Sequence, residues 1–250
     1  RNGHSGVDFS SKFSPWLANG SVSARQIHAA LLAHERRRGA SDGSRWIVFE
    51  LLWREHFRWL HARFGRRLYH ARGLAPQAGP PAHDAAAFAR WCAGRTGEPL
   101  VDAGLRELAA TGYLSNRLRQ VVASALIHDA PGDWRAGAAW FEHQLVDYDV
   151  HSNHGNWLYI AGRGTDPRGG RRFNPEKQAR EHDPDGSYNN ADDMTWWAKR
   201  SGLIQLAGVI TNGPYKHPRA RSKVWQLTRA GEIAAAEPEP MELPGENVDG

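Results

Sequence analysis

The residues with the greatest capacity for chemistry lie in one short segment, from Asp147 to Tyr159. Such a segment can ligate a metal ion, cap the start of a helix, or line the pocket of a large planar cofactor. These three interpretations imply different functions, so the rest of the chain has to decide among them. The segment combines carboxylates, imidazoles and carboxamides with a tryptophan: Asp147, Asp149, His151, His154, Asn153, Asn156 and Trp157.

The metal interpretation rests on Asp149, His151 and His154, whose oxygen and nitrogen atoms are ordinary metal ligands. A zinc or iron site needs further ligands and an ordered second layer of residues. The sequence offers few, because Cys92 is its single cysteine and neither an H-E-x-x-H pattern nor a calcium loop occurs. We therefore expect no metal. The capping interpretation, with Asp147 and Asp149 at a helix start, leaves the asparagines without a role.

Helices must position this segment, because helix-start patterns recur along the chain and nothing before Tyr188 alternates like a strand. Ser23 and Gln26 have the spacing of a capping box, which begins a helix that Gly39 ends. Ser44 is expected to cap the next helix, which carries aromatic side chains and a carboxylate at helical spacing: Trp46, Phe49, Glu50, Trp53 and Phe57. Further helix starts are expected at Asp102, Ser115, Asp133 and Asn174-Pro175. The pattern predicts an all-α domain.

Composition restricts the class of protein. The formal net charge of +5, from 32 basic and 27 acidic residues, suits a polyanionic partner but also an ordinary basic surface. One cysteine excludes a disulfide scaffold. No apolar run is long enough to cross a bilayer, and the first residues lack the pattern of a signal peptide. We expect a cytoplasmic monomer. The 11 tryptophans suit either an aromatic core or redox chemistry with a planar cofactor.

Five blocks of residues, in the same order along the chain, resemble the photolyase/cryptochrome family. They are residues 10–17 (SSKFSPWL), 49–55 (FELLWRE), 97–119, 147–157, and 161–168 with 172–175. Tyr159 and Gln120 favour the DASH-type cryptochromes, since classical dimer photolyases are expected to carry Trp and Met there. The resemblance extends over residues 1–188 and implies a helical FAD-binding domain. It therefore favours the cofactor interpretation of the 147–159 segment.

The resemblance also implies roles toward FAD. The serines around Lys12 would hold the diphosphate, Arg119 and Asp147 would lie beside the isoalloxazine ring, Asp149 would meet its pyrimidine edge, and Asn153 would face N5. Each of these also has an ordinary interpretation as a helix-end hydrogen bond. The full set expected at the cofactor is Ser10, Ser11, Lys12, Ser14, Glu50, Arg54, Arg119, Asp147, Asp149 and Asn153.

For the substrate, the resemblance implies a cyclobutane pyrimidine dimer in DNA, bound by Glu50, Trp53, Asn116, Gln120 and Tyr159. Apart from the resemblance, a carboxylate on the aromatic face of a helix is costly to bury unless it is paired. Glu50 could therefore instead form a buried ion pair with Arg54 or Arg119.

Trp157 and Trp134 resemble the inner and middle members of the family's electron relay. With Glu50, Trp53 and Asn116 they form the expected catalytic set. An outer tryptophan is expected near residues 78–82, where the chain reads AGPPA. Photoreduction of the flavin is therefore expected to be slow, or to use Trp91 or a tyrosine.

The expected activity is that of a deoxyribodipyrimidine photo-lyase, a carbon–carbon lyase driven by light. Reduced FAD would donate one electron to the dimer, preferably in single-stranded DNA, where unpairing costs least. Two alternatives stay open. One is a blue-light-sensing or nucleic-acid-binding flavoprotein without repair activity. The other is an inactive, truncated fusion whose DNA-binding tail does the work.

The residues after Tyr188 follow a different pattern. Family members are expected to have an α/β antenna domain before the residue that corresponds to Arg1, and an Arg-x-Trp-x-Pro-Glu-Leu stretch after Tyr188. Residues 190–236 instead predict a small winged-helix-like α+β tail, with a short helix at 195–202, a basic loop, and a strand at 223–228. Residues 237–250 are acidic and proline-rich and are expected to be disordered.

Overall fold

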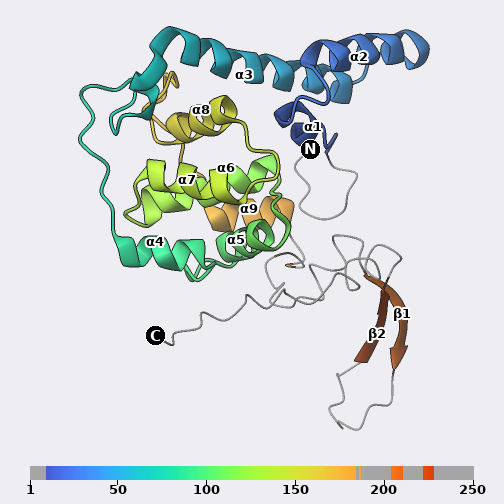
Figure 1. Ribbon diagram of the computed structural model, residues 1–250. Coiled ribbons are helices and arrows are strands. Elements are labelled where there is room, and N and C mark those ends of the chain that lie inside the picture. Colours follow the sequence, from blue (N-terminus) through green and yellow to red (C-terminus); the bar gives the residue numbers. More distant parts are fainter. Residues whose placement is uncertain (1–9, 184–185, 187, 189–203, 211–221, 228–250) are drawn as a thin grey trace, which may run out of the picture. The chain divides into compact units, whose positions relative to one another are not determined.

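The computed structural model describes residues 10–183, 186, 188, 204–210 and 222–227 (Figure 1). The chain divides into two compact units, Arg1–Ala191 and Asp192–Gly250, which are described separately here. Among the described residues, none of the helices is both long and apolar enough to cross a membrane.

All the regular elements among the described residues of the first unit are helices, which confirms the all-α expectation. A 3₁₀ turn, η1, continues the longest helix, α3, and a π turn, η2, continues α6. The elements are α1 (Ser14–Ala18), α2 (Ala24–Arg38), α3 (Asp42–Phe64), η1 (Gly65–Tyr69), α4 (Ala85–Cys92), α5 (Pro99–Thr111), α6 (Asn116–Ser124), η2 (Ala125–Asp129), α7 (Trp134–Gln144), α8 (Val150–Ile160) and α9 (Pro175–His182).

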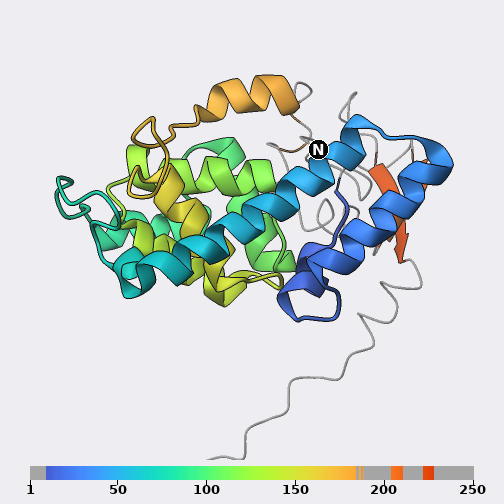
Figure 2. The same cartoon turned by 90° about the horizontal axis from the view of Figure 1, so that it is seen from above.

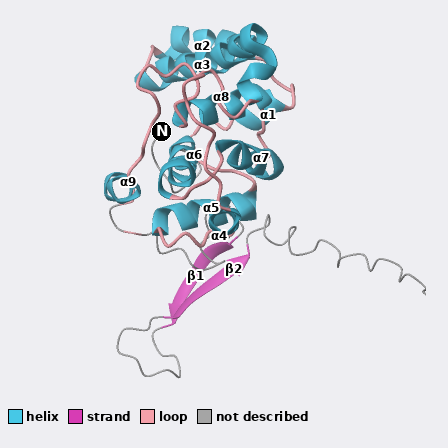
Figure 3. Cartoon of the chain, turned by 90° about the vertical axis from the view of Figure 1, so that its left-hand side faces the viewer, coloured by secondary structure: helices cyan, strands magenta, loops and turns pink. Residues whose placement is uncertain are grey.

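Helix α8 lies at the centre of this unit and packs against α3, η1, α6 and α7. Figures 1 and 3 show α3 along one side of the unit, α8 beneath it, α6 and α7 next, and α4 and α5 on the opposite side. Seen from above, α3 crosses over the helices beneath it, and α2 lies beside its first half (Figure 2). The core between these layers contains large, fully buried side chains: Trp91, Leu105, Leu118, Trp134 and Trp157.

Local capping patterns predicted several helix starts correctly. Ser23 and Gln26 form the predicted reciprocal capping box, and Gly39 ends α2. The side chains of the other confirmed caps accept hydrogen bonds from the first turns of α6, α7 and α9: Ser115, Asp133 and Asn174.

Two predicted caps are wrong. Ser41 caps α3, and Ser44 is instead the third helical residue of the same capping box. Asp102 lies inside the first turn of α5, where its carboxylate accepts hydrogen bonds from the backbone of Thr96 and Gly97. It therefore fixes the turn that precedes the helix rather than the helix start itself.

The apolar residues of α3 are more exposed than their spacing suggests. Phe57 is buried against α8, whereas Trp46 and Phe49 are close to half exposed and Trp59 is 73% exposed. Glu50 is also exposed. The alternative in which Glu50 is buried in an ion pair with Arg54 or Arg119 is therefore wrong.

The described part of the second unit is an antiparallel hairpin of β1 (Ile204–Ile210) and β2 (Ser222–Leu227). Its register runs from Ile204 opposite Leu227 to Ile210 opposite Ser222, with an irregularity between Leu206 and Gly208. The strand predicted at 223–228 is confirmed as β2, whereas β1 was not predicted. The predicted helix at 195–202, most of the basic loop and the acidic end lie outside the described residues.

Candidate cofactor and substrate site

A buried ion pair fixes the chain just before α8. Nη2 of Arg119, on α6, donates to both carboxylate oxygens of Asp147 at 2.9 and 2.8 Å. The side chain of Asp147 is only 2% exposed. Arg119 also donates from Nε to the carbonyl oxygen of Leu114 at 2.8 Å. The guanidinium is therefore held in one orientation at the entrance to α8, as the resemblance implies for the side of the flavin ring.

The two aspartates of the 147–159 segment have different roles. Asp149 is the N-cap of α8, and its Oδ1 accepts a hydrogen bond from the backbone N–H of Ser152 at 2.8 Å. Burial opposes ionisation of Asp149, but the hydrogen bonds from Ser152 and the positive charges of Arg54 and His151 outweigh it, so its pKa is lowered. The capping interpretation is therefore correct for Asp149 and wrong for Asp147.

The serine-rich turn is tied to this ion pair by a residue that the sequence analysis did not single out. Nζ of Lys12 lies 4.3 Å from the ring centre of Tyr113, and the guanidinium of Arg119 lies 5.7 Å from the same ring. The hydroxyls of Ser10 and Tyr113 are 3.2 Å apart. Tyr113 thus connects the turn expected at the diphosphate with the guanidinium expected at the flavin ring. Its role depends on tertiary contacts, which no local pattern reveals.

The other residues of that turn lie as follows. Lys12 has a φ of +57°, which is unusual for a residue other than glycine and marks a tight turn. Ser11 is exposed, and Ser14 is the first residue of α1.

Asn153 lies one turn into α8 and is buried. Its Nδ2 donates to the carbonyl oxygen of Ala138 at 2.9 Å, which fixes the side chain against α7. Its Oδ1 accepts no hydrogen bond from any described residue. A fixed guanidinium, an ionised carboxylate at Asp149 and an amide oxygen with spare acceptor capacity fit the polar edge of a flavin, which presents both donors and acceptors.

Two of the five residues expected at the substrate, Trp53 and Tyr159, form an aromatic corner. The rings of Trp53 on α3 and Tyr159 on α8 meet edge to face, with their centres 5.6 Å apart. Gln120 is half-buried and accepts a hydrogen bond from Arg117 at 3.2 Å, whereas Glu50 and Asn116 are exposed.

The hydroxyl of Tyr159 is held by Arg171, another residue that the sequence analysis did not single out. Nη2 of Arg171 donates to the hydroxyl of Tyr159 at 2.6 Å, and its Nε donates to the buried Asp166 at 2.6 Å. The spacing of Asp166 and Arg171 in a glycine-rich loop was visible in the sequence, but their partner was not.

Arg54 donates to Glu55 at 2.8 Å and contributes its charge to Asp149. Arg54 follows Trp53 on α3, and Glu55 is its one side-chain partner among the described residues.

The two expected relay tryptophans are deep in the core. Trp157 packs against Gly137 of α7, and Trp134 lies one turn earlier on the same helix. The ring of Trp157 also meets the rings of Trp91 and Phe141, at 6.3 and 5.2 Å. Nε1 of Trp134 donates to the carbonyl oxygen of Ala71 at 3.2 Å.

The two histidines of the metal interpretation, His151 and His154, contact other aromatic rings. The rings of His151 and His61 meet at 4.7 Å, and those of His154 and Tyr69 at 4.6 Å. In the part of the chain that the structure describes, no three His, Cys, Asp or Glu side chains are arranged to hold a metal ion.

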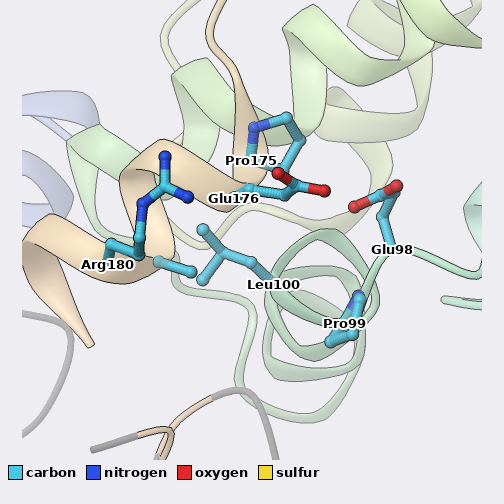
Figure 4. Close-up of a pocket in the computed structure, with 7 residues that line it drawn as sticks. Glu98, Pro99, Leu100, Pro175, Glu176 and Arg180 are labelled. Carbon is cyan, nitrogen blue, oxygen red and sulfur yellow. The ribbon is translucent and has the colours of Figure 1, made fainter. Parts of the chain in front are cut away.

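A separate, open cavity of about 350 Å³ lies between α5 and α9. Figure 4 shows the carboxylates of Glu98 and Glu176 on one side of Leu100 and the guanidinium of Arg180 on the other. None of the residues expected at the cofactor or the substrate lines this cavity.

This arrangement defines a class of protein. Residues 46–191 match the family model described as the FAD binding domain of DNA photolyase, so the chain belongs to that family and FAD is the cofactor of this domain. Within the family it is similar to the DASH-type cryptochromes. It is 45% identical to Cryptochrome DASH of Xenopus laevis over 236 residues, an alignment that covers 90% of this chain and 45% of that protein.

Solved structures agree. The cryptochrome of Synechocystis sp. PCC6803 is 47% identical, with a TM-score of 0.74, over 80% of this chain and 40% of that one. An archaeal photolyase from Sulfolobus tokodaii, solved with two FAD molecules, is 31% identical, with a TM-score of 0.65, over 78% of this chain and 43% of that one. The chain thus spans less than half the length of these relatives. The alignment with the Xenopus laevis protein continues beyond residue 188, into the residues expected to form an unrelated tail. Their winged-helix-like character stays a prediction.

Proposed function

We propose that the protein uses light to repair cyclobutane pyrimidine dimers, preferentially in single-stranded DNA. The observation that carries this proposal is the aromatic corner of Trp53 and Tyr159, with the exposed carboxylate of Glu50 one turn before Trp53 on α3. Two rings that meet edge to face offer apolar surface to a pair of joined pyrimidines, and a carboxylate accepts hydrogen bonds from their N–H groups.

When bound, FAD supplies light absorption and the transfer of one electron to the dimer. The chain positions the reactants. Arg119 is fixed by Asp147 and places a positive charge where a reduced, anionic ring is favoured. Asn153 would present an acceptor oxygen to the ring, and Lys12 would provide a cation for the diphosphate. Arg171 holds the hydroxyl of Tyr159 and so sets the angle of that ring in the substrate corner.

The preference for single strands follows from the cost of moving a dimer out of a duplex. Extrusion requires unpairing and unstacking, which cost a few kcal/mol and are least for bases that are already single-stranded. The half-exposed rings of Trp46 and Phe49 lie next to Trp53 in an edge-to-face series along α3. Exposed aromatic rings of this kind are stacking partners for unpaired bases.

The test is a repair assay on a single-stranded oligonucleotide with one thymine dimer, using protein whose FAD has been reduced chemically. Glu50→Ala is expected to lower the repair yield strongly while the flavin stays bound, because Glu50 is exposed and its loss leaves no buried cavity. Glu50→Gln should retain part of the yield, since the amide keeps one acceptor. The matched control is Glu176→Ala, an exposed glutamate on α9, which should repair normally.

Other outcomes point to the other two functions. A wild-type protein that binds one FAD per chain and single-stranded DNA, but leaves the dimer intact, would be a light-responsive or nucleic-acid-binding flavoprotein without repair. A colourless protein that cannot be reconstituted with FAD would leave the tail as the working part. The cytoplasmic location and the monomeric state stay predictions, and gel filtration coupled to light scattering measures the latter.

A further inference from the structure

A cluster of rings outside the expected site connects the buried tryptophan of α7 with the protein surface. The rings of Trp134 and His154 are 6.3 Å apart, and those of His154 and Tyr69 are 4.6 Å apart. The ring of His61 also meets that of Tyr69, with the ring centres 5.5 Å apart. Trp134 is fully buried, whereas Tyr69 is 38% exposed. Three rings in near contact therefore lead from the core to solvent.

The imidazoles of this cluster are arranged to accept protons. Nδ1 of His61 lies 2.9 Å from the carbonyl oxygen of Phe57, and Nδ1 of His154 lies 3.2 Å from that of Val150. A carbonyl oxygen only accepts, so Nδ1 carries the hydrogen and Nε2 is the basic nitrogen in each neutral ring. Nε2 of His61 is buried and has no hydrogen-bond partner within the described residues.

Both imidazoles are kept neutral. Burial lowers the pKa of His61 and of His154. The electrostatic effect of His151 lowers the pKa of His61 further, and that of His61 lowers the pKa of His154 further. Burial and the charge of Glu142 raise the pKa of Tyr69, so this tyrosine carries its phenolic proton at neutral pH. A protonated phenol next to two unprotonated imidazoles can lose an electron and a proton together.

We propose that Tyr69 is the terminal electron donor for light-driven reduction of the cofactor, acting through His154 on Trp134. This inference rests on the proposed light-driven function. FAD, when bound and excited by light, would supply the oxidant for Trp134, and an oxidised Trp134 would take one electron from the phenol of Tyr69. The phenolic proton moves to Nε2 of a flanking imidazole, which leaves a neutral tyrosyl radical and an imidazolium. A thiol in solution then returns one electron to Tyr69, and the imidazolium returns the proton.

Tyr69 is exposed to solvent, whereas Trp91, the other candidate for the terminal electron donor, is buried. Trp91 is in ring contact with Trp157 but is 0% exposed, and its Nε1 donates to the carbonyl oxygen of Val122 at 2.9 Å. A radical on Trp91 would be out of reach of a soluble reductant and would return its charge to the cofactor. Residues 78–82, where an outer tryptophan was expected, contain none.

The test compares Tyr69→Phe with the control Tyr148→Phe. Tyr148 lies near Tyr69, and burial and a hydrogen bond with Glu142 raise its pKa to about 12, but its ring has no contact with His154 among the described residues. Protein with fully oxidised FAD is illuminated with blue light in the presence of a thiol. The Tyr69→Phe variant is expected to lose most of the flavin reduction and the tyrosyl absorption that follows decay of the tryptophan radical. The Tyr148→Phe variant should behave as wild type.

A second readout locates the radical without relying on cofactor reduction. A nitroxide trap added during illumination should label Tyr69 in wild type, as read by peptide mass spectrometry. Normal reduction in the Tyr69→Phe variant, or loss of reduction in the Tyr148→Phe variant instead, would overturn the proposal. Repair by wild-type protein with chemically reduced FAD bypasses this route. A failed repair assay together with a labelled Tyr69 therefore refutes only the repair function.

Discussion

The two sides of α8 are built in different ways. Toward α6 and α7, the polar groups are buried and paired: Asp147 with Arg119, and Asn153 with the backbone of Ala138. Toward α3 and η1, half-exposed rings meet one another, among them His154 with Tyr69 and Tyr159 with Trp53. Toward α6 and α7, α8 therefore holds polar groups in fixed positions for a cofactor. The ring contacts toward α3 and η1, here called the joint, include the imidazole of His154, so their stability depends on the protonation of that ring.

The contrast has a physical basis. An ion pair with a buried carboxylate is confined to few arrangements, because any displacement leaves that charge without its partner in a medium of low polarity. Contacts between half-exposed rings are individually weak, about 0.5–1.5 kcal/mol. Rings on the α3 side can therefore exchange one ring contact for another, or gain a proton, at a small cost in free energy. This property suits a substrate pocket and a route for protons and electrons.

The largest expected effect is on the paired side. Replacing Asp147 with Asn leaves Arg119 without its anionic partner, and breaking such a pair typically costs about 3–5 kcal/mol. The free energy of unfolding of the helical unit, followed by far-ultraviolet circular dichroism in urea, should fall by about that amount. Flavin occupancy must be matched between the samples, since a bound ligand adds stability of its own.

The double variant Arg119→Met, Asp147→Leu provides the control. It removes both charges together, so it should be more stable than Asp147→Asn alone, although it should no longer hold flavin in its anionic form. A loss of less than about 1 kcal/mol in Asp147→Asn, the value typical of exposed pairs, would mean that the pair is solvated and that the two sides of α8 are alike.

The paired side was also the more predictable from the sequence. Helix caps such as Ser115 of α6 and Asp133 of α7 are local, so their patterns can be recognised without tertiary structure. The Arg119 and Asp147 pair was implied by collinear blocks that resemble a known family. The choice between Ser41 and Ser44 could not be predicted, because two serines three residues apart both suit a cap, and the hydrogen bond from Ser44 to Glu35 of α2 is a tertiary contact.

Residues of the joint were missed because their contacts join distant parts of the chain. Tyr69 and His154, like Arg171 and Tyr159, lie on different elements, and nothing in the local pattern of either reveals the other. The exposure of Glu50 was missed for a related reason. Its helical spacing with aromatic residues suggested a buried face, but only Phe57 on that face is covered by α8.

An intermediate effect is expected at a tightly packed contact between α8 and α3. Gly155 of α8 lies against the ring of Phe57 on α3, and a methyl group at this position would overlap the ring. Overpacking of this kind typically costs about 1–3 kcal/mol. Gly155→Ala should therefore lower the free energy of unfolding by that amount and weaken the docking of α3, as measured by faster amide hydrogen exchange in α3.

Gly43→Ala is the matched control for Gly155→Ala. Gly43 is also helical, but a methyl group there would meet only Oγ of Ser41, at an ordinary 3.6 Å. Because alanine favours helices over glycine by about 1 kcal/mol, this variant should be as stable as wild type or more stable. Equal behaviour of the two variants would show that α3 is not closely packed on α8.

The smallest expected effect is a pH dependence confined to the joint. The pKa values of His61 and His154 are lowered from 6.5 by burial, so the unfolded chain binds more protons than the folded one as the pH falls below about 6.5. Their neutral forms therefore stabilise the fold at neutral pH, and this stabilisation is lost as the pH falls toward their folded-state pKa values. Both rings keep some contact with water, so the slope should be shallow.

The measurement is the free energy of unfolding between about pH 7.5 and 5. The test protein is the double variant His61→Gln, His154→Gln, and the control is His28→Gln, at an exposed histidine. Asp149 does not interfere, since a carboxylate whose pKa is lowered from 3.8 loses its stabilisation only at more acidic pH. The double variant should flatten the slope, whereas His28→Gln should leave it unchanged. If the free energy of unfolding of the double variant still falls between about pH 7.5 and 5 as it does in wild type, other groups titrate in this range. The stability of the joint would then not depend on the protonation of His61 and His154.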